Sequence, residues 1–219
     1  MLDISSQRSV QEVAPHSAAK KRRKIFWQQL HTWHWVSSAI CLIGMLLFSI
    51  TGITLNHAGQ IEAQPSIART AVQLPPELLA ALEAQKGQPT LSAEVTDWLD
   101  ERLSEHTRNR APEWSDDELY IALPRPGGDA WISIDLTSGE LEYERTDRGW
   151  IAYFNDLHKG RHTGAVWSGF IDVFAVATLV FSITGLLLLK LHSKHRPATW
   201  PTVGLGCAVM LFIMIVFIH

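Results

Sequence analysis

Histidine is the residue type whose placement in this chain points most directly to chemistry. The chain has ten histidines. Eight of them lie close to an end of a long apolar run: His31, His34, His57, His158, His162, His192, His195 and His219. Imidazole nitrogens bind haem iron, and they also suit zinc, copper and nickel. The other explanation of the pattern is that these side chains are polar anchors at a membrane surface.

Three apolar runs set the positions of these histidines, at residues 35–55, 167–189 and 203–218. A hydrocarbon core of about 30 Å is crossed by roughly 20 helical residues, so the first two runs are long enough to span a bilayer. The third run is shorter, but Trp200 and Pro201 can extend it into the interface, and a bilayer can thin locally around it. We therefore expect three transmembrane helices, at residues 25–57, 166–191 and 201–219.

The segment between the first two runs, residues 58–165, is polar and acidic. It contains 19 acidic and 10 basic residues, a local net charge of −9 in a chain whose net charge is −3. Such a charge excludes a nucleic-acid-binding surface on this segment. Apolar periodicity predicts two helices, at 74–85 and 92–103, and then three strands, at 118–123, 130–136 and 139–146. The predicted fold class is therefore an α-helical membrane protein of three transmembrane helices, with a small α+β domain inserted between helices 1 and 2.

Basic residues predict the orientation of the chain. Residues 1–24 read as a disordered tail that ends in the cluster KKRRK, and residues 192–200 form a loop with basic residues and no acid. Positive charge is retained on the cytoplasmic side of a membrane, so both segments are expected in the cytoplasm. Residues 58–165 and the C-terminus then lie outside, which for a bacterial inner membrane is the periplasm. Nucleic-acid binding by the basic cluster is the minor alternative.

With this orientation the histidines near the spans form one group on each side of the membrane. The groups are His31, His34, His192 and His195 inside, and His57, His158, His162 and His219 outside. Bis-imidazole ligation of a b-type haem needs one histidine from each of two neighbouring elements, so two haems are expected, one per membrane face. The expected ligands are His34 with His192 inside and His57 with His158 outside, and their substitutes are His31, His195 and His162.

Two spacings along the chain bear on this arrangement. From His34 to His57 is 23 residues, or about 35 Å of helix, which places one ligand at each interface. From His162 to His192 is 30 residues, or about 45 Å if all were helical. Because that is too long for one untilted span, we expect either a break at Gly164 or Gly169 or a helix that projects outside the membrane.

Asp172 is a carboxylate placed inside the second predicted span. An ionisable group in a membrane is costly and is by default a candidate functional residue. It could accept a hydrogen bond from the free ring N–H of a ligating histidine, as is common around metal sites. Pairing with Arg161, or snorkelling of the carboxylate to the interface, are the alternatives.

Two identical pentapeptides, FSITG, occupy residues 48–52 and 181–185, near the C-terminal ends of the first two spans. A Leu-His pair precedes each span, at residues 30–31 and 157–158. Because the two spans run in opposite directions, the repeats are inverted in the membrane. Small and polar residues on a span allow close approach of another helix or of a flat cofactor.

In these segments, LHTWHWVSSAICLIGMLLFSITGITLNH, AWISIDLTSGELEYE and LHKGRHTGAVW, the chain resembles the bacterial PepSY-associated transmembrane proteins. The resemblance covers roughly residues 25–195. It implies a PepSY-like character for the periplasmic α+β domain. The wider family includes haem-containing inner-membrane siderophore-iron reductases with histidine axial ligands, which implies haem b as the cofactor and ferric-reductase-like oxidoreductase chemistry.

The expected function is electron transfer through b-type haems, from quinol or a cytosolic reductase to a periplasmic acceptor such as a ferric chelate or a redox protein. The expected partners are the lipid bilayer and either a second copy of the chain or another membrane subunit, because three spans make a thin wall around two porphyrins. Two other functions remain open. One is a non-catalytic, membrane-anchored binding or regulatory module, and the other is a metal-handling accessory protein.

Overall fold

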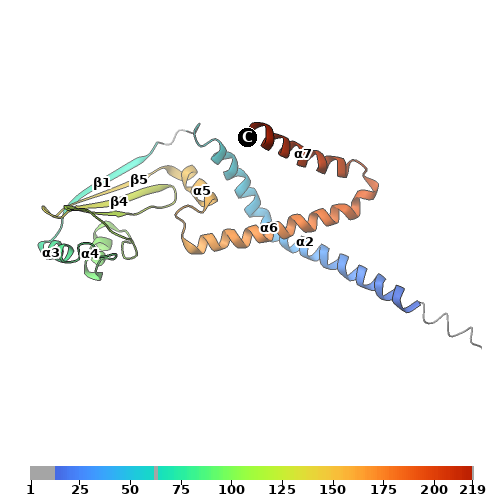
Figure 1. Ribbon diagram of the computed structural model, residues 1–219, viewed down its shortest axis with the longest axis horizontal. Helices are drawn as coiled ribbons and strands as arrows, with labels where there is room; N and C mark the ends of the chain where they lie inside the picture. Colours follow the sequence, from blue (N-terminus) through green and yellow to red (C-terminus); the bar gives the residue numbers. More distant parts are fainter. Residues whose placement is uncertain (1–12, 62–63, 219) are drawn as a thin grey trace, which may run out of the picture. The chain divides into compact units, whose positions relative to one another are not determined.

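The computed structural model describes residues 13–61 and 64–218. The chain forms two compact units: the first comprises the chain up to Leu46 and from Asp172 onward, and the second is Leu47–Ile171. Figure 1 shows the elements, which are, in chain order, α2 (Val13–Asn56), β1 (Ser66–Gln73), α3 (Pro76–Ala84), α4 (Ala93–Leu103), β2 (Glu113–Trp114), β3 (Glu118–Ala122), β4 (Gly128–Asp135), β5 (Glu140–Asp147), α5 (Gly149–Lys159), α6 (Gly164–His192), the 3-10 turn η1 (Ser193–His195) and α7 (Thr199–Phe217).

Within the described part of the chain, three helices are long and apolar enough to cross a membrane. They are Ala18–Asn56 within α2, the whole of α6 and the whole of α7. Their large apolar side chains are mostly exposed, and α7 buries none of its residues. Apolar helices whose side chains face outward, with backbone groups satisfied internally, are what a bilayer accommodates.

The expected fold class is wrong in the order of its elements. The chain runs from the first long helix into a five-stranded sheet and places both remaining long helices, α6 and α7, at the C-terminal end. The α+β part does not consist of two helices followed by three strands, because β1 precedes both of its helices. The sequence of β1, SIARTAVQ, has no period-2 apolar pattern from which a strand could be predicted, and almost all of its side chains are exposed. It joins the sheet by backbone pairing with β5, from Ser66↔Asp147 to Gln73↔Glu140.

The basic tail also differs from expectation. Residues 1–12 lie outside the described residues, but the chain is helical from Val13 through the KKRRK cluster. Alanine, lysine and arginine are strong helix formers, and extending an existing helix avoids the cost of nucleation. The predicted disorder of residues 13–24 is therefore wrong.

The sheet of the second unit is antiparallel throughout, in the order β1-β5-β4-β3-β2. Its inner strands alternate between buried and exposed side chains, and α3 and α4 cover the face with the buried ones (Figure 1). The core formed there includes Leu78, Leu82, Val95, Leu99, Ile121, Ile132, Ile134 and Leu141. Burial of these aliphatic side chains provides the main stabilisation of the domain.

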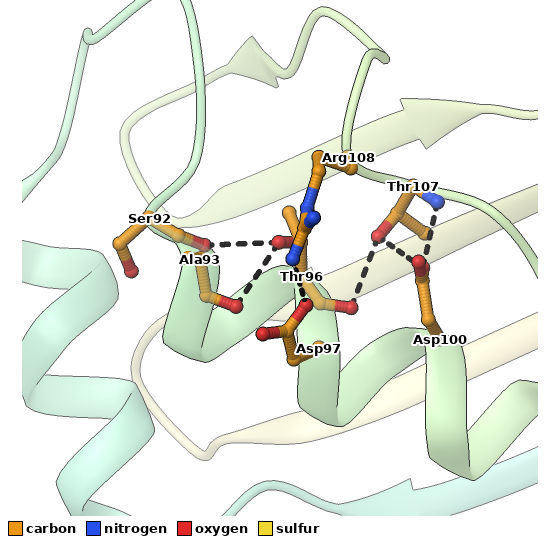
Figure 2. Close-up of polar contacts among 7 residues, drawn as sticks. All are labelled: Ser92, Ala93, Thr96, Asp97, Asp100, Thr107 and Arg108. Atoms are coloured by element: carbon orange, nitrogen blue, oxygen red, sulfur yellow. Dashed lines mark hydrogen bonds and ion pairs between the residues drawn. The ribbon is translucent and has the colours of Figure 1, made fainter.

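Polar contacts fix the segment that follows α4 (Figure 2). The backbone N–H and the hydroxyl of Thr107 both donate to Asp100 Oδ1, each over 2.7 Å. Arg108 forms an ion pair with Asp97, which lies on α4 one helical turn before Asp100. The helix itself ends at Ser104, whose φ of 55° is left-handed. These contacts turn the chain back along α4 and close one edge of the core.

Three ionisable groups of this domain have shifted pKa values. Burial, with nearby carboxylates, raises the pKa of Tyr120. Backbone N–H groups of Ser138 and Thr137 donate to Asp135 in the β4–β5 turn and lower the pKa of its carboxyl. Burial raises the pKa of Tyr143 to about 12, and its bond to Glu105 adds to the effect. Asp135 and Tyr143 both form hydrogen bonds within the domain.

Candidate functional site

One candidate site lies in the first unit, where His34 of α2 meets the FSITG segment of α6. His34 Nδ1 is 3.0 Å from the hydroxyl oxygen of Thr184 and 3.3 Å from the carbonyl oxygen of Phe181. The imidazole stacks on the Phe181 ring, with centroids 4.8 Å apart and planes at 12°. A Cβ added to Gly185 would lie 3.2 Å from His34 Cε1, so glycine is needed for this close approach. His34 is half-buried in this seat.

A second candidate site lies in the second unit, where His158 of α5 meets the FSITG segment of α2. His158 Nδ1 is 2.7 Å from the hydroxyl oxygen of Thr51. The Phe48 ring lies against the imidazole, with centroids 4.9 Å apart. A Cβ added to Gly52 would meet His158 Cε1 at 3.6 Å. His158 is half-buried as well.

The two sites are reciprocal copies of one arrangement. In each, the phenylalanine, threonine and glycine of one FSITG repeat hold a histidine that precedes the other repeat in the chain. The threonine supplies the polar contact and the phenylalanine the ring contact. The glycine gives extra room only at Gly185, because a Cβ at Gly52 would be in ordinary contact with the imidazole. The identical pentapeptides therefore serve as two seats for imidazole.

The hydrogen bonds of the threonines favour one tautomer of each ring. Thr184 Oγ1 donates to the carbonyl oxygen of Val180, and Thr51 Oγ1 donates to that of Leu47. A hydroxyl has one proton, so a threonine that donates it to a carbonyl accepts from its histidine. In a neutral imidazole with its hydrogen on Nδ1, Nε2 keeps the lone pair. An imidazole in this state is ready to bind a metal ion through Nε2.

The other expected ligands make a related contact within their own helices. His57 Nδ1 lies 3.0 Å from the carbonyl oxygen of Ile53, and His192 Nδ1 lies 2.9 Å from that of Leu188. A carbonyl can only accept, so these rings also carry the proton on Nδ1. Both side chains are exposed. In a neutral imidazole, this arrangement leaves the lone pair on Nε2 in all four expected ligands.

Two histidines of the inner group, His31 and His192, lie side by side in the first unit. His31, His34 and His192 all belong to it, and the rings of His31 and His192 are 6.2 Å apart at 80°. His195 ends η1, and its side chain lies outside the described part of the structure. The choice of ligand within each close pair stays a prediction.

The outer group lies in the second unit, but not as a helical pair. His158 is near the end of α5, which stops at Gly160 with φ 66°. His162 follows in the loop with φ 58°, and α6 begins at Gly164. The chain therefore turns between α5 and α6, with Gly164 at the start of α6, and His158 and His162 do not share a helix. His219 lies outside the described residues.

Asp172 is exposed on α6. Its bond to an outer histidine stays a prediction.

Three contacts fix α5 and with it His158. The hydroxyl of Thr54, on α2, donates to Asn155 Oδ1 over 2.7 Å. The buried carboxylate of Asp156 accepts the backbone N–H of Gly127 over 2.9 Å. The indole N–H of Trp167, at the start of α6, donates to the carbonyl oxygen of Leu157 over 2.9 Å. Helix α5 is thus bonded to α2, to the sheet and to α6 within the second unit.

Sequence reasoning found the histidines but missed their partners. Thr51, Thr184 and Asn155 were not expected to contact them or position them. The signal was present in the repeated pentapeptide, which indicated close approach without saying what approaches. Among the described residues, no group of three or more histidine, cysteine, aspartate or glutamate side chains is arranged to hold a metal ion.

The fold and these sites define a membrane protein with long apolar helices, a five-stranded antiparallel sheet and paired imidazole seats. The chain belongs to the family described as putative PepSY_TM-like, whose model matches residues 25–219. No curated protein and no solved structure matches the chain. The family match confirms the resemblance inferred from the sequence, and the relation to haem-containing reductases stays a prediction.

Proposed function

We propose that this protein transfers electrons across the membrane through b-type haems held by histidines near the two ends of α2. The observation that carries the proposal is the reciprocal seating of His34 on Thr184 and of His158 on Thr51. A structural histidine at a membrane surface needs no fixed tautomer. A ligand to haem iron does, because the metal takes the lone pair of one ring nitrogen while the other is held by a hydrogen bond.

The donor set fits a two-ligand iron site. Haem iron needs two axial ligands, because the porphyrin supplies the remaining four, so a cluster of three protein ligands is not required. His34 with His192 would hold the inner haem, and His158 with His57 the outer one. Thr184 and Thr51 would orient the rings and keep the Nδ1 proton in place. A bound haem b would supply reversible one-electron transfer.

The proposed orientation of the chain in the membrane rests on its basic segments. The KKRRK cluster at the start of α2 and the basic residues at the end of α6 both favour the cytoplasmic side of a bacterial inner membrane. The sheet domain and the C-terminus would then be periplasmic. Electrons would enter from quinol or a cytosolic reductase and leave to a ferric chelate or a redox protein outside.

The test is a visible spectrum of the full chain, purified in detergent from haem-supplied cells and reduced with dithionite. We expect a Soret band and a b-type α band, with two haems per chain by pyridine haemochrome analysis. His34→Ala and His158→Ala should each remove one haem. The matched control is His106→Ala, because His106 is exposed in the sheet domain, away from every span.

A preparation without these bands would refute the proposal. Metal analysis of that same preparation would then distinguish a metal-handling accessory protein, with metal bound in place of haem, from a membrane-anchored binding module that contains neither.

A further inference from the structure

A cavity of about 460 Å³ opens at the end of the sheet where β5 leads into α5. Three stretches of the second unit line it. They are the β3–β4 turn with Arg125, the end of β5 with Arg145 and Asp147, and the first turns of α5 with Trp150 and Tyr153. The cavity shares no residue with either histidine seat.

The lining of the cavity is basic on balance. Two arginines face one aspartate there, so the charged side chains sum to +1. Arg125 Nη2 bonds Asp147 Oδ2 over 3.2 Å, while the other Asp147 oxygen accepts the backbone N–H of Gly149. Arg125 Nε is buried and has no hydrogen-bond partner among the described residues.

The guanidinium of Arg145 has N–H groups available for a further partner. Its closest carboxylate is Glu105, at 4.0 Å from Arg145 Nη1, and the same Glu105 oxygen already accepts the Tyr143 hydroxyl. The Arg145 side chain is 46% exposed. A guanidinium has five N–H donors in a planar fork that matches two oxygens of one anion. Arg125 and Arg145 together therefore offer a site for a group with several anionic oxygens.

The helix beside the cavity has the features of a membrane-interface helix. Trp150 is 76% exposed, and Ile151 and Phe154 are also exposed. The rings of Trp150 and Phe154 lie 6.4 Å apart, so they form one aromatic face on α5. Only the short loop after Gly160 separates α5 from the membrane-length helix α6. Amphipathic helices with exposed tryptophan next to a span lie at the level of lipid headgroups.

We propose that this cavity binds a phosphate group between Arg125 and Arg145, and that an anionic phospholipid headgroup supplies it. A phosphodiester carries one negative charge, which complements the net +1 of the lining. The lipid glycerol and chains would lie along the aromatic face of α5. The site would hold the sheet domain against the membrane surface.

The test is native mass spectrometry of the full chain in detergent, with phosphatidylglycerol or phosphatidylcholine added. We expect preferential retention of phosphatidylglycerol, and a decrease of about tenfold in that retention in the Arg125→Gln/Arg145→Gln double variant, since hydrogen bonds to charged groups are being removed. The matched control is Arg108→Gln. Arg108 is 63% exposed, pairs with Asp97 and lies outside the cavity (Figure 2). Equal retention by the double variant and the wild type would overturn the proposal.

A second measurement keeps the result independent of folding. The shift in thermal midpoint caused by phosphatidylglycerol is measured for each variant against its own lipid-free state, with Arg125→Lys/Arg145→Lys as the charge-retaining variant. A shift in the wild type and in the lysine variant, and none in the glutamine variant, supports the site. A shift caused by inorganic phosphate alone, dependent on the same arginines and absent with the lipid, overturns the lipid as the source.

Discussion

The contact of His158 with Thr51 repeats, atom for atom, the contact of His34 with Thr184. In both pairs the imidazole Nδ1 meets a threonine hydroxyl, at 2.7 Å and 3.0 Å, and the hydroxyl donates to the carbonyl of its own helix. The hydrogen bonding of the two rings differs, because His34 Nδ1 has a second acceptor, the carbonyl oxygen of Phe181. That difference makes the two seats separable by experiment.

Replacing Thr51 with valine should destabilise the protein more than replacing Thr184 with valine. In Thr51→Val the Nδ1 proton of a half-buried ring loses its acceptor, which costs about 1–3 kcal/mol. In Thr184→Val the Phe181 carbonyl remains as an acceptor, so the loss should be smaller. Thermal unfolding in detergent measures both. Ser182→Ala is the control, since Ser182 is exposed and bonds only Thr178 of its own helix.

The same two variants should raise the midpoint potential of the haem that each histidine would bind. Loss of the Nδ1 hydrogen bond makes an imidazole a poorer electron donor to iron, and this favours the reduced state. A redox titration followed in the visible spectrum measures it. Unchanged potentials, with only the stability lowered, would show that the threonines have a purely structural role.

His34 should be the inner ligand in preference to His31. Both precede the first span, but His34 is fixed by Thr184, whereas His31 contacts only the edge of the His192 ring among the described residues. We expect His34→Ala and His192→Ala to remove the same haem, and His31→Ala to retain it. Haem stoichiometry of the three variants decides the matter. Loss of haem in His31→Ala, with retention in His34→Ala, would reverse the assignment.

The parts of the fold that could be predicted are those with a strong local pattern. The membrane-length helices follow from the length of their apolar runs, and β3, β4 and β5 follow from alternation along ELYIA, GDAWISID and ELEYERTD. A break between His162 and His192 is one of the alternatives that helix length leaves open. Each of these features depends on residues close together in the chain.

The parts that could not be predicted depend on contacts between distant residues. Strand β1 exists because of its pairing with β5, and its own side chains are exposed on both faces. Helix α5 is short, and its buried residues include the polar pair Asn155 and Asp156, whose partners lie far away in the chain. The seat of His158 depends on both, since it needs α5 to bring the ring to Thr51. A repeat in the sequence shows that two segments are alike, but not which residues they hold.

Tyr143 should make the sheet domain less stable as the pH rises above about 10. Burial raises its pKa to about 12 in the folded state, so the folded protein holds this proton more tightly than the unfolded chain does. The stabilisation is fully present below the unfolded pKa and is lost as the pH rises toward about 12. Ultraviolet titration of tyrosinate measures the ionisation, and the chain has only three tyrosines.

Two variants check the assignment of that ionisation. Tyr143→Phe should remove the most alkaline phase of the titration. Glu105→Gln keeps an acceptor for the hydroxyl but removes the negative charge, so it should lower the pKa of Tyr143. If the alkaline phase persists in Tyr143→Phe, it belongs to another tyrosine and the predicted pH dependence does not hold.

Replacing Gly44 with alanine should destabilise the packing of α2 on α6 in the first unit. A Cβ built at this position would overlap the ring of Phe174, so Gly44→Ala forces the ring or the helices apart. Overpacking of this kind costs about 1–3 kcal/mol. Gly206→Ala is the control, because nothing lies within 4 Å of a Cβ at that position on α7. It should be neutral or stabilise by up to about 1 kcal/mol, since alanine is the better helix former.

A double-mutant cycle with Phe174→Ala isolates the contact of Gly44 with Phe174. The cost of Gly44→Ala should largely disappear once the ring is removed. An unchanged cost in that background would show that the glycine is required for another reason.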